Sequence, residues 1–307
     1  MKFAINQYGL AHHYGDPAAI VRGAQLAEAA GFDMFVVTDH LVMGEQTDQY
    51  PYGQWPTPLD FPWWEPMTVM AVVAGATQRL RLSTGVLLAP LRPTALLAKQ
   101  AATLDQLSGG RLELGLGVGW QKAEYDAVRV DFATRRRYFV EQLRVMRLLW
   151  MEKCVSFQGE FHSFDRIYCH PQPRQLGGVP ICVGIAPSEA NLKWIVELAD
   201  GWLPIDDDPS VYGPMIARVK AALEEAGRDP GRFTFRARFP YVVGADGQPS
   251  LRATFERLPD IERAGITQVE VYPVVCLRTK APSELEDVIA ECGELMKEYR
   301  RASGNRH

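Results

Sequence analysis

The chain has 307 residues, of which 47% are hydrophobic, 10% aromatic and 23% charged. This composition is typical of a folded globular protein and excludes a disordered or fibrous one. The formal net charge of −4 gives no support to nucleic acid or an anionic membrane surface as the principal partner.

Short runs of apolar and β-branched residues alternate along the chain with stretches of helical periodicity. They predict strands at Lys2–Tyr8, Met34–Thr38, Arg81–Leu87, Leu112–Leu116, Pro180–Val183, Gly201–Pro204, Thr234–Tyr241 and Gln268–Tyr272. Between them, helices are predicted from Pro17 to Ala30, from Pro93 to the Gly109–Gly110 pair, around Phe139–Trp150 and around Leu285–Tyr299. Eight strand-then-helix units are what a (β/α)8 barrel requires, whereas a doubly wound sheet has fewer strands. We therefore expect one α/β domain over residues 1–307, a TIM-type (β/α)8 barrel with two insertions.

The first insertion covers residues 41–64 and is rich in proline and in aromatic side chains. Because it follows the second strand, it leaves the carboxyl end of the barrel, where active sites lie. Two interpretations stand: a wall of a pocket for an apolar or planar ligand, with Trp55, Trp63 and Trp64 on the substrate side, or a long loop packed on its own aromatics. The second insertion, residues 154–173, alternates in polarity around Gly159, which predicts a hairpin of structural role at the opposite end of the barrel.

Three strand ends carry residues suited to chemistry, and barrel topology brings them to one mouth. The second strand ends in Asp39 and His40; an imidazole there can relay a proton near neutrality, although a capping aspartate beside a core histidine gives the same pattern. Gly85, inside the third strand, predicts a bulge or the close approach of a backbone or ligand. After the fourth strand, Gly117 and Gly119 let the main chain lie against a flat or phosphorylated ligand, or form only a tight turn.

Several common site motifs are missing from the sequence. The glycines do not complete the G-x-G-x-x-G pattern of a Rossmann dinucleotide site, and H-E-x-x-H, C-x-x-C and G-x-S-x-G do not occur. We therefore predict neither a dedicated metal site nor a serine-hydrolase site.

Four motifs in the right order carry a resemblance to a known family. They are T-D-H at 38–40, S-T-G-V at 83–86 followed by A-K-Q-A-A-T-L-D-Q-L-S-G-G-R-L, G-L-G-V-G-W at 115–120, and L-A-D-G-W-L-P at 198–204. The chain resembles the bacterial-luciferase-like flavin or deazaflavin oxidoreductases over almost its whole length. It is most similar to their coenzyme F420-dependent branch.

The resemblance implies a TIM-type barrel with the cofactor lying across its mouth. Residue by residue, His40 matches the histidine beside the reactive centre of the deazaflavin, and Asp39 matches its neighbour in the cofactor pocket. Thr84, Gly85 and Val86 match the segment behind the middle ring, with a non-proline cis peptide between Gly85 and Val86. The segment Gly117, Val118, Gly119 and Trp120 matches the one beside the polar side of the cofactor and its ribityl chain.

One segment departs from the family pattern. Where many relatives have two glycines for the ribityl phosphate, this chain reads Gly184-Ile185-Ala186-Pro187-Ser188. Ala186 and Ser188, with the N–H groups that begin the next helix, are the expected phosphate contacts here. The basic run Arg135–Arg137 opens the helix after the fourth strand, where it either meets an anionic cofactor tail or is simply a solvated turn.

The leading hypothesis is an F420-dependent oxidoreductase that moves a hydride between the deazaflavin C5 and a small organic substrate, with His40 as proton donor or acceptor. The alternatives are an FMN-dependent monooxygenase of the same superfamily that uses O₂, and a barrel that binds a flavin without turnover. No signal peptide or membrane span is predicted, so we expect a cytoplasmic protein. Relatives commonly form homodimers, which leaves a homodimer open for this chain.

Overall fold

The computed structural model describes residues 1–206 and 208–304, and its strands form a closed parallel barrel. The order of the strands in the main sheet is β3-β2-β1-β13-β10-β9-β8-β5-β4. A parallel bridge between Leu82 and Leu112 joins β3 to the chain entering β5 and closes the ring. The strands are β1 (Lys2–Asn6), β2 (Met34–Val37), β3 (Arg81–Thr84), β4 (Leu87–Leu88), β5 (Leu114–Gly117), β8 (Ile181–Val183), β9 (Gly201–Trp202), β10 (Thr234–Arg238) and β13 (Gln268–Val271). The predicted TIM-type barrel is confirmed.

All eight predicted strands are present, but the third is interrupted. One continuous strand was predicted from Arg81 to Leu87. The structure instead has two strands, β3 and β4, separated by Gly85 and Val86. The two halves occupy one position in the ring, because β3 pairs with β2 while β4 pairs with β5. The interior glycine therefore marks a break in the strand, as its position suggested.

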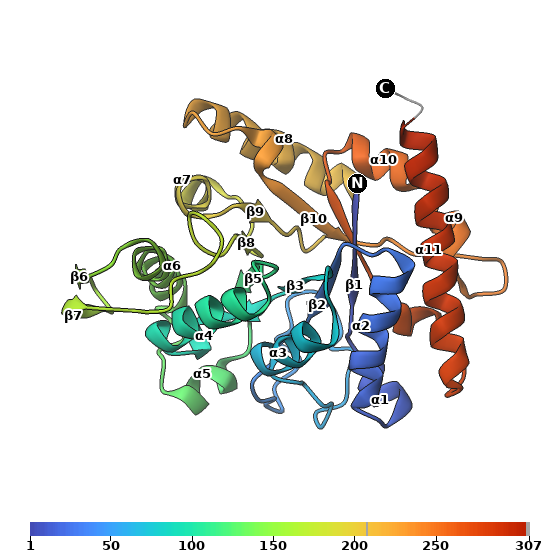
Figure 1. Cartoon of the computed structure of the whole chain (residues 1–307), viewed down its shortest axis with the longest axis horizontal. Coiled ribbons are helices and arrows are strands. Elements are labelled where there is room, and N and C mark those ends of the chain that lie inside the picture. The colour runs from blue at the N-terminus through green and yellow to red at the C-terminus, as the bar shows by residue number, and fades with distance from the viewer. Residues whose placement is uncertain (207, 305–307) are drawn as a thin grey trace.

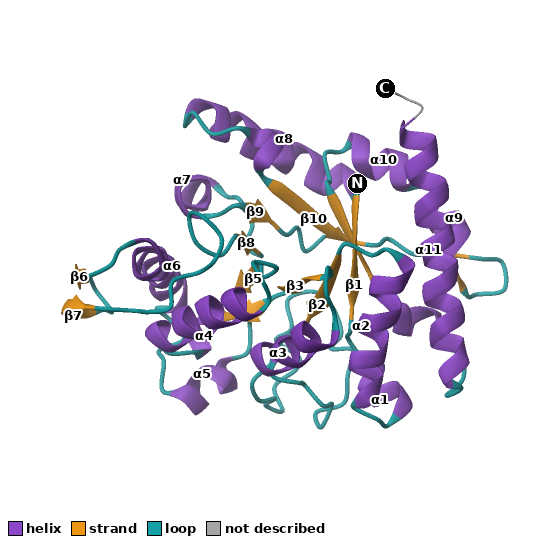
Figure 2. Cartoon of the chain, in the orientation of Figure 1, coloured by secondary structure: helices purple, strands orange, loops and turns teal. Residues whose placement is uncertain are grey.

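The helices surround the strands on the outside of the barrel (Figures 1 and 2). They are α1 (Leu10–Tyr14), α2 (Ala18–Ala30), α3 (Pro66–Ala76), α4 (Thr94–Leu107), α5 (Lys122–Val128), α6 (Arg135–Met151), α7 (Glu189–Leu198), α8 (Pro209–Glu225), α9 (Leu251–Phe255), α10 (Leu258–Arg263) and α11 (Pro282–Gly304). α11 packs against α2, so the last helix closes the ring beside the first strand-helix unit (Figure 1). Among the described residues no helix is long and apolar enough to cross a membrane.

The alternation of side chains along the strands divides the core into two layers. Phe3, Ile5 and Phe35 belong to the large cluster between the strands and the helices. Their neighbours Ala4, Met34 and Val36 form a separate small cluster inside the barrel. Because successive side chains of a strand point to opposite faces, the same apolar strands supply both layers.

The two insertions leave the barrel at different places. Residues 38–65 contain no described helix or strand, and they connect β2 to α3 at the carboxyl end. The second insertion forms an antiparallel pair, β6 (Val155–Gln158) and β7 (Ser163–Ile167), outside α6 (Figure 1). Its turn does not stay at the opposite end of the barrel, because Glu141 of α6 accepts the N–H groups of Glu160, Phe161 and His162. The hairpin thus packs along the outside of α6, with its turn beside Glu141.

Candidate active site

A cavity of about 500 Å³ opens at the carboxyl ends of the strands. Most of the residues that the sequence placed there line it: Asp39, His40, Trp55, Trp63, Gly85, Val86, Gly117, Val118, Gly119 and Trp120. They come from the ends of three strands and from the aromatic loop, which we define as residues 41–64. The topology thus brings together groups that lie up to about 80 residues apart in the chain, as expected for a barrel mouth.

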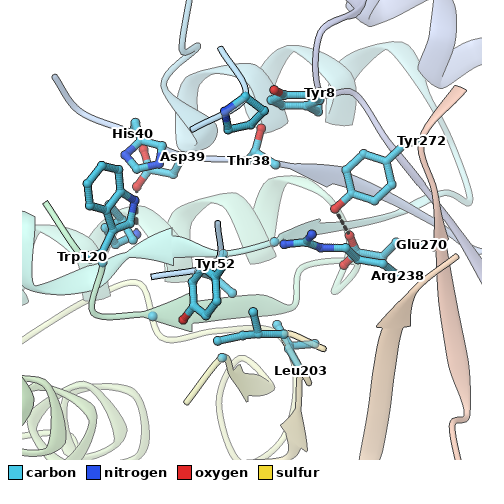
Figure 3. A pocket seen from close by; sticks show the side chains of 18 of the residues that line it. Tyr8, Thr38, Asp39, His40, Tyr52, Trp120, Leu203, Arg238, Glu270 and Tyr272 are labelled. Atoms are coloured by element: carbon cyan, nitrogen blue, oxygen red, sulfur yellow. Dashed lines mark hydrogen bonds between the residues drawn. The ribbon is translucent and has the colours of Figure 1, made fainter. Parts of the chain in front are cut away.

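His40 lies on one wall of the cavity and is held from behind by Glu124 (His40 labelled in Figure 3). Its ring Nδ1 is 3.1 Å from Glu124 Oε2, and Glu124 is completely buried on α5. The other oxygen of Glu124 accepts the backbone N–H of Leu41 at 2.8 Å. The carboxylate therefore fixes both the imidazole and the chain that follows it, and it leaves Nε2 as the ring nitrogen for chemistry in the cavity.

Asp39 lines the cavity, but its carboxylate is already paired. Arg92 donates from Nη1 and Nη2 to the two Asp39 oxygens at 2.7 and 3.0 Å, and the N–H of Leu88 donates to Asp39 Oδ2 at 2.8 Å. Arg92 also reaches Glu65 Oε1 at 3.2 Å. Asp39 precedes the aromatic loop and Glu65 follows it, so the Arg92 guanidinium joins both ends of that loop.

The floor of the cavity is made by Val86 and by the glycines beneath it. The peptide bond between Gly85 and Val86 is cis, as the resemblance implied. A Cβ at Gly117 would come within 2.7 Å of Val86 Cγ2, so only glycine allows this contact between β5 and the broken third strand. Val86 therefore rests directly on main chain, which gives the cavity a smooth apolar floor.

Thr84 does not line the cavity. Its side chain is fully buried, and its hydroxyl donates to Gly115 O at 2.7 Å and accepts from Gly115 N at 3.0 Å. Thr84 thus fastens β3 to β5 beneath the floor. Its contribution is to place the next two residues, Gly85 and Val86.

Three tryptophans surround the His40 imidazole, and Tyr50 packs on two of them. The ring centroids of Trp63 and Trp55 lie 4.7 and 5.2 Å from it, and Trp120 packs on Trp55 at 5.2 Å. The Nε1–H groups of these three tryptophans are buried and have no hydrogen-bond partner among the described residues. A buried donor left unpaired costs about 1–3 kcal/mol. Both interpretations of the loop thus hold in part, because its aromatics pack on one another and also wall the cavity.

Trp64 lies elsewhere, although it was expected beside Trp63. It packs against the large core cluster and borders a second, very small cavity rather than the main one. Ala186 and Ser188 are also absent from the residues that line the main cavity, and both are exposed. Ser188 is the N-cap of α7, where its hydroxyl caps no N–H group. Gly184, two residues before Ala186, is the part of this segment that reaches the cavity.

The opposite end of the cavity is polar, and sequence reasoning missed it (Figure 3). Tyr272 donates from its hydroxyl to Glu270 Oε2 at 3.1 Å, and Glu270 Oε1 lies 2.8 Å from Nε of the fully buried Arg236 as an ion pair. Burial raises the pKa of the Tyr272 phenol well above its ordinary value, and the Glu270 charge raises it further, so the phenol stays protonated. Tyr8 and Tyr272 are the last residues of two predicted strands. Because strand ends meet at the barrel mouth, this position could have indicated that both residues belong to the site.

Arg238, also on β10, sits among the phenols of this end. Its charge lowers the pKa of Tyr8, Tyr52 and Tyr272, although burial outweighs it and each pKa is raised. Arg136, the middle residue of the basic run, acts on Tyr52 in the same way. Its two neighbours are engaged elsewhere, because Arg135 stacks on Phe132 and Arg137 pairs with Glu160. Arg136 is therefore the residue of the run whose charge acts on a side chain that lines the cavity.

Comparison with known proteins decides the family. Residues 1–305 match the family model described as luciferase-like monooxygenase. The chain belongs to this family. Membership in the luciferase-like family makes it an oxidoreductase of the flavin- or deazaflavin-dependent type.

The luciferase-like relatives span most of the chain. An uncharacterized protein of Mycobacterium tuberculosis is 32% identical over 270 residues, which cover 85% of this chain and 90% of the relative. Pyrimidine monooxygenase RutA of Escherichia coli is 34% identical over 203 residues, 62% of this chain and 53% of the relative.

Among solved structures, the monooxygenase RslO1 from Streptomyces bottropensis has a TM-score of 0.81 at 20% identity, and the match covers 98% of this chain and 100% of that one. An F420-dependent secondary alcohol dehydrogenase in complex with an F420–acetone adduct has a TM-score of 0.71 at 19% identity, covering 96% and 97%. At these identities the two structures show a shared fold.

The contact between Glu124 and His40 makes a first prediction. Glu124→Gln keeps an oxygen for the Leu41 N–H but removes the negative charge beside the imidazole, so we expect kcat to fall about 10- to 100-fold with KM little changed. Asp126→Asn on the same helix is the matched control, because Asp126 forms an exposed pair with Lys122. Steady-state kinetics with both variants measures the effect. Equal activities would show that Glu124 serves only the fold.

Proposed function

We infer that the protein is an F420-dependent oxidoreductase that transfers a hydride between the deazaflavin C5 and a small organic substrate. The observation that carries this proposal is the placement of His40 in one cavity with the Gly85–Val86 step and the segment Gly117–Trp120. A proton-transfer group, a smooth floor and a glycine-rich wall are what a planar redox ring and its substrate require.

The residues present fit such a ring. The floor formed by Val86 is apolar, and the close contacts at Gly117 and Gly184 keep the main chain near it, since a Cβ at either position would approach Val86 to 2.7 or 3.0 Å. The polar end supplies the guanidinium of Arg238, while the Tyr272 phenol already donates to the paired carboxylate of Glu270. We propose that Gly117–Trp120 borders the polar edge and side chain of the cofactor, and that the start of α7 near Ser188 receives its phosphate.

The deazaflavin, when bound, supplies or accepts the hydride. Reduction of a substrate carbonyl also needs one proton at the oxygen, and His40 donates it from Nε2; in the reverse direction the same nitrogen takes the proton. Glu124 holds the ring in place through Nδ1. The aromatic loop covers this nitrogen and keeps water from competing for the transfer.

Direct titration tests the cofactor. We expect saturable binding of F420 to the purified protein and weaker binding of FMN. Quenching of the cofactor's fluorescence measures both. An F420 tail ends in carboxylates and FMN has none, so Arg136→Glu should weaken F420 binding about tenfold and leave FMN unchanged. Arg137→Glu is the control, because Arg137 already pairs with Glu160 away from the cavity. Absence of saturable F420 binding would overturn the proposal.

The FMN-dependent monooxygenase is the second candidate, because RutA, to which the chain is similar, is by name a pyrimidine monooxygenase. The two candidates share the fold and the position of His40, so the same titration separates them. Tight binding of FMN, with equal loss for both cofactors in Arg136→Glu, would favour the monooxygenase.

A further inference from the structure

The indole groups around His40 present hydrogen-bond donors that have no acceptor. Nε1 of Trp55, Trp63 and Trp120 is buried without a partner among the described residues, and each of these tryptophans lines the cavity. Buried donors are normally paired, and an indole N–H can only donate. Three such groups around one imidazole therefore need an explanation beyond apolar packing.

The aromatic rings themselves cover these N–H groups. Trp55 lies 6.0 Å from Trp63 and 5.2 Å from Trp120 between ring centroids, and Tyr50 packs on both Trp55 and Trp120 at 5.0 and 5.2 Å. A ligand atom reaches the N–H groups only when these rings separate. The start of the aromatic loop is held by Glu124 and Gln121, and Arg92 joins the two flanking residues, Asp39 and Glu65, so the residues between can move without breaking these contacts.

The surroundings define the chemistry of the group that would meet these donors. The two carboxylates that line the cavity are both paired, Asp39 with Arg92 and Glu270 with Arg236. The walls near His40 are aromatic and apolar, so they favour a flat molecule without charge. Oxygen acceptors on that molecule would pair with the indole N–H groups and with Nε2 of His40, with about two donors to each oxygen.

We propose that the substrates are planar, uncharged carbonyl compounds, and that Trp55, Trp63 and Trp120 determine this specificity by donating hydrogen bonds to the carbonyl oxygens when the aromatic loop opens around the ligand. The inference deepens the proposed function, since it names the substrate class of the same site. The carbonyl oxygen beside Nε2 of His40 is the atom that receives the proton when the adjacent carbon receives the hydride.

Two probes of nearly equal shape test the specificity. 9-Fluorenone is a planar ketone, and fluorene is the corresponding hydrocarbon without an acceptor. In equilibrium dialysis we expect the protein to bind fluorenone about tenfold or more tighter than fluorene. Equal affinities for the two probes would overturn the proposal.

Phenylalanine variants assign the effect to the indole N–H groups. The readout is the ratio of the fluorenone and fluorene affinities, because loss of apolar contact lowers both. The single oxygen of fluorenone accepts about two hydrogen bonds, so we expect at least one of Trp55→Phe, Trp63→Phe and Trp120→Phe to reduce this ratio about three- to tenfold. Trp64→Phe is the matched control, because its Nε1 is also buried without a partner while its ring lies outside the cavity. In Trp64→Phe the ratio of the fluorenone and fluorene affinities should equal that of the unmodified protein.

A competing explanation is that the N–H groups already point at neighbouring ring faces, which are weak acceptors. In that case the three variants would lose more stability to urea than Trp64→Phe and would keep the affinity ratio, and this result would overturn the proposal.

The dialysis is run without F420 and with F420 at saturation, which separates this inference from the cofactor assignment. Ketone preference in a protein that fails to bind F420 supports the inference and contradicts the proposed function. If the protein binds F420 but binds both probes with equal affinity, the result supports the proposed function and contradicts the inference about the substrate.

Discussion

Replacing His40 with asparagine lowers kcat by about two to four orders of magnitude, while the dissociation constant for F420 stays nearly the same. Asparagine occupies a similar volume and still contacts Glu124, but it cannot donate or accept a proton near neutrality. The floor at Gly85–Val86 and the wall at Gly117–Trp120 are untouched, so binding of the cofactor should persist. Fluorescence titration and turnover of the same sample measure the two quantities.

His170→Asn is the control for this substitution. His170 is exposed and lies outside the cavity, so its loss should leave both quantities unchanged. If His40→Asn kept full turnover, the proton would have to come from another group, and the Tyr272 phenol at the polar end would be the next candidate. A protein that binds flavin without turnover would have no rate to lose, so the variant also separates that alternative.

Replacing Arg236 with methionine lowers the free energy of unfolding by about 3–5 kcal/mol. Arg236 is fully buried inside the barrel, where Nη1 lies 3.2 Å from Glu113 and Nε lies 2.8 Å from Glu270. Burial opposes its charge, but Glu270 and Glu113 more than offset that effect and raise the pKa of the guanidinium. Without it, two carboxylates remain in the barrel and lose the cation that pairs with both of them. Urea unfolding measures the loss.

Arg252→Met is the matched control, since Arg252 and Glu298 form an exposed pair whose removal should leave stability unchanged. An equal loss in both variants would contradict this account of the barrel interior.

The boundaries of the strands followed from the sequence to within a few residues, and the exception has a physical cause. Apolar alternation marks where a strand enters the core, so β1, β2 and β13 begin at the predicted residues. The third strand was predicted as continuous, yet it breaks at Gly85, because a pattern of side chains does not record a change in the backbone. The motif that carried the family resemblance located that change.

The candidate site was predicted in part, and the missing residues differ in how visible they were. Tyr8 and Tyr272 stood at the ends of predicted strands, so the topology rule that selected His40 applied equally to them. Glu124 gave no such signal, because it lies on a helix 84 residues after His40 and an acidic residue on a helix is usually solvated. Trp64 was predicted to belong to the site but does not. Its neighbour Trp63 lines the cavity, whereas the Trp64 ring packs against the core.

Three features could be predicted from the sequence alone: the eightfold alternation of strands and helices, the strand ends that meet at the barrel mouth, and the motifs of the luciferase-like family. These features are local patterns of polarity and residue type, which are visible in the order of the residues. The tertiary fold set which side chains reach the cavity and placed Arg92 between Asp39 and Glu65, the residues that flank the aromatic loop. It also buried three indole N–H groups near His40 that have no acceptor among the residues the structure describes. Those facts depend on the directions of side chains and on contacts between distant segments, which are fixed only when the barrel closes.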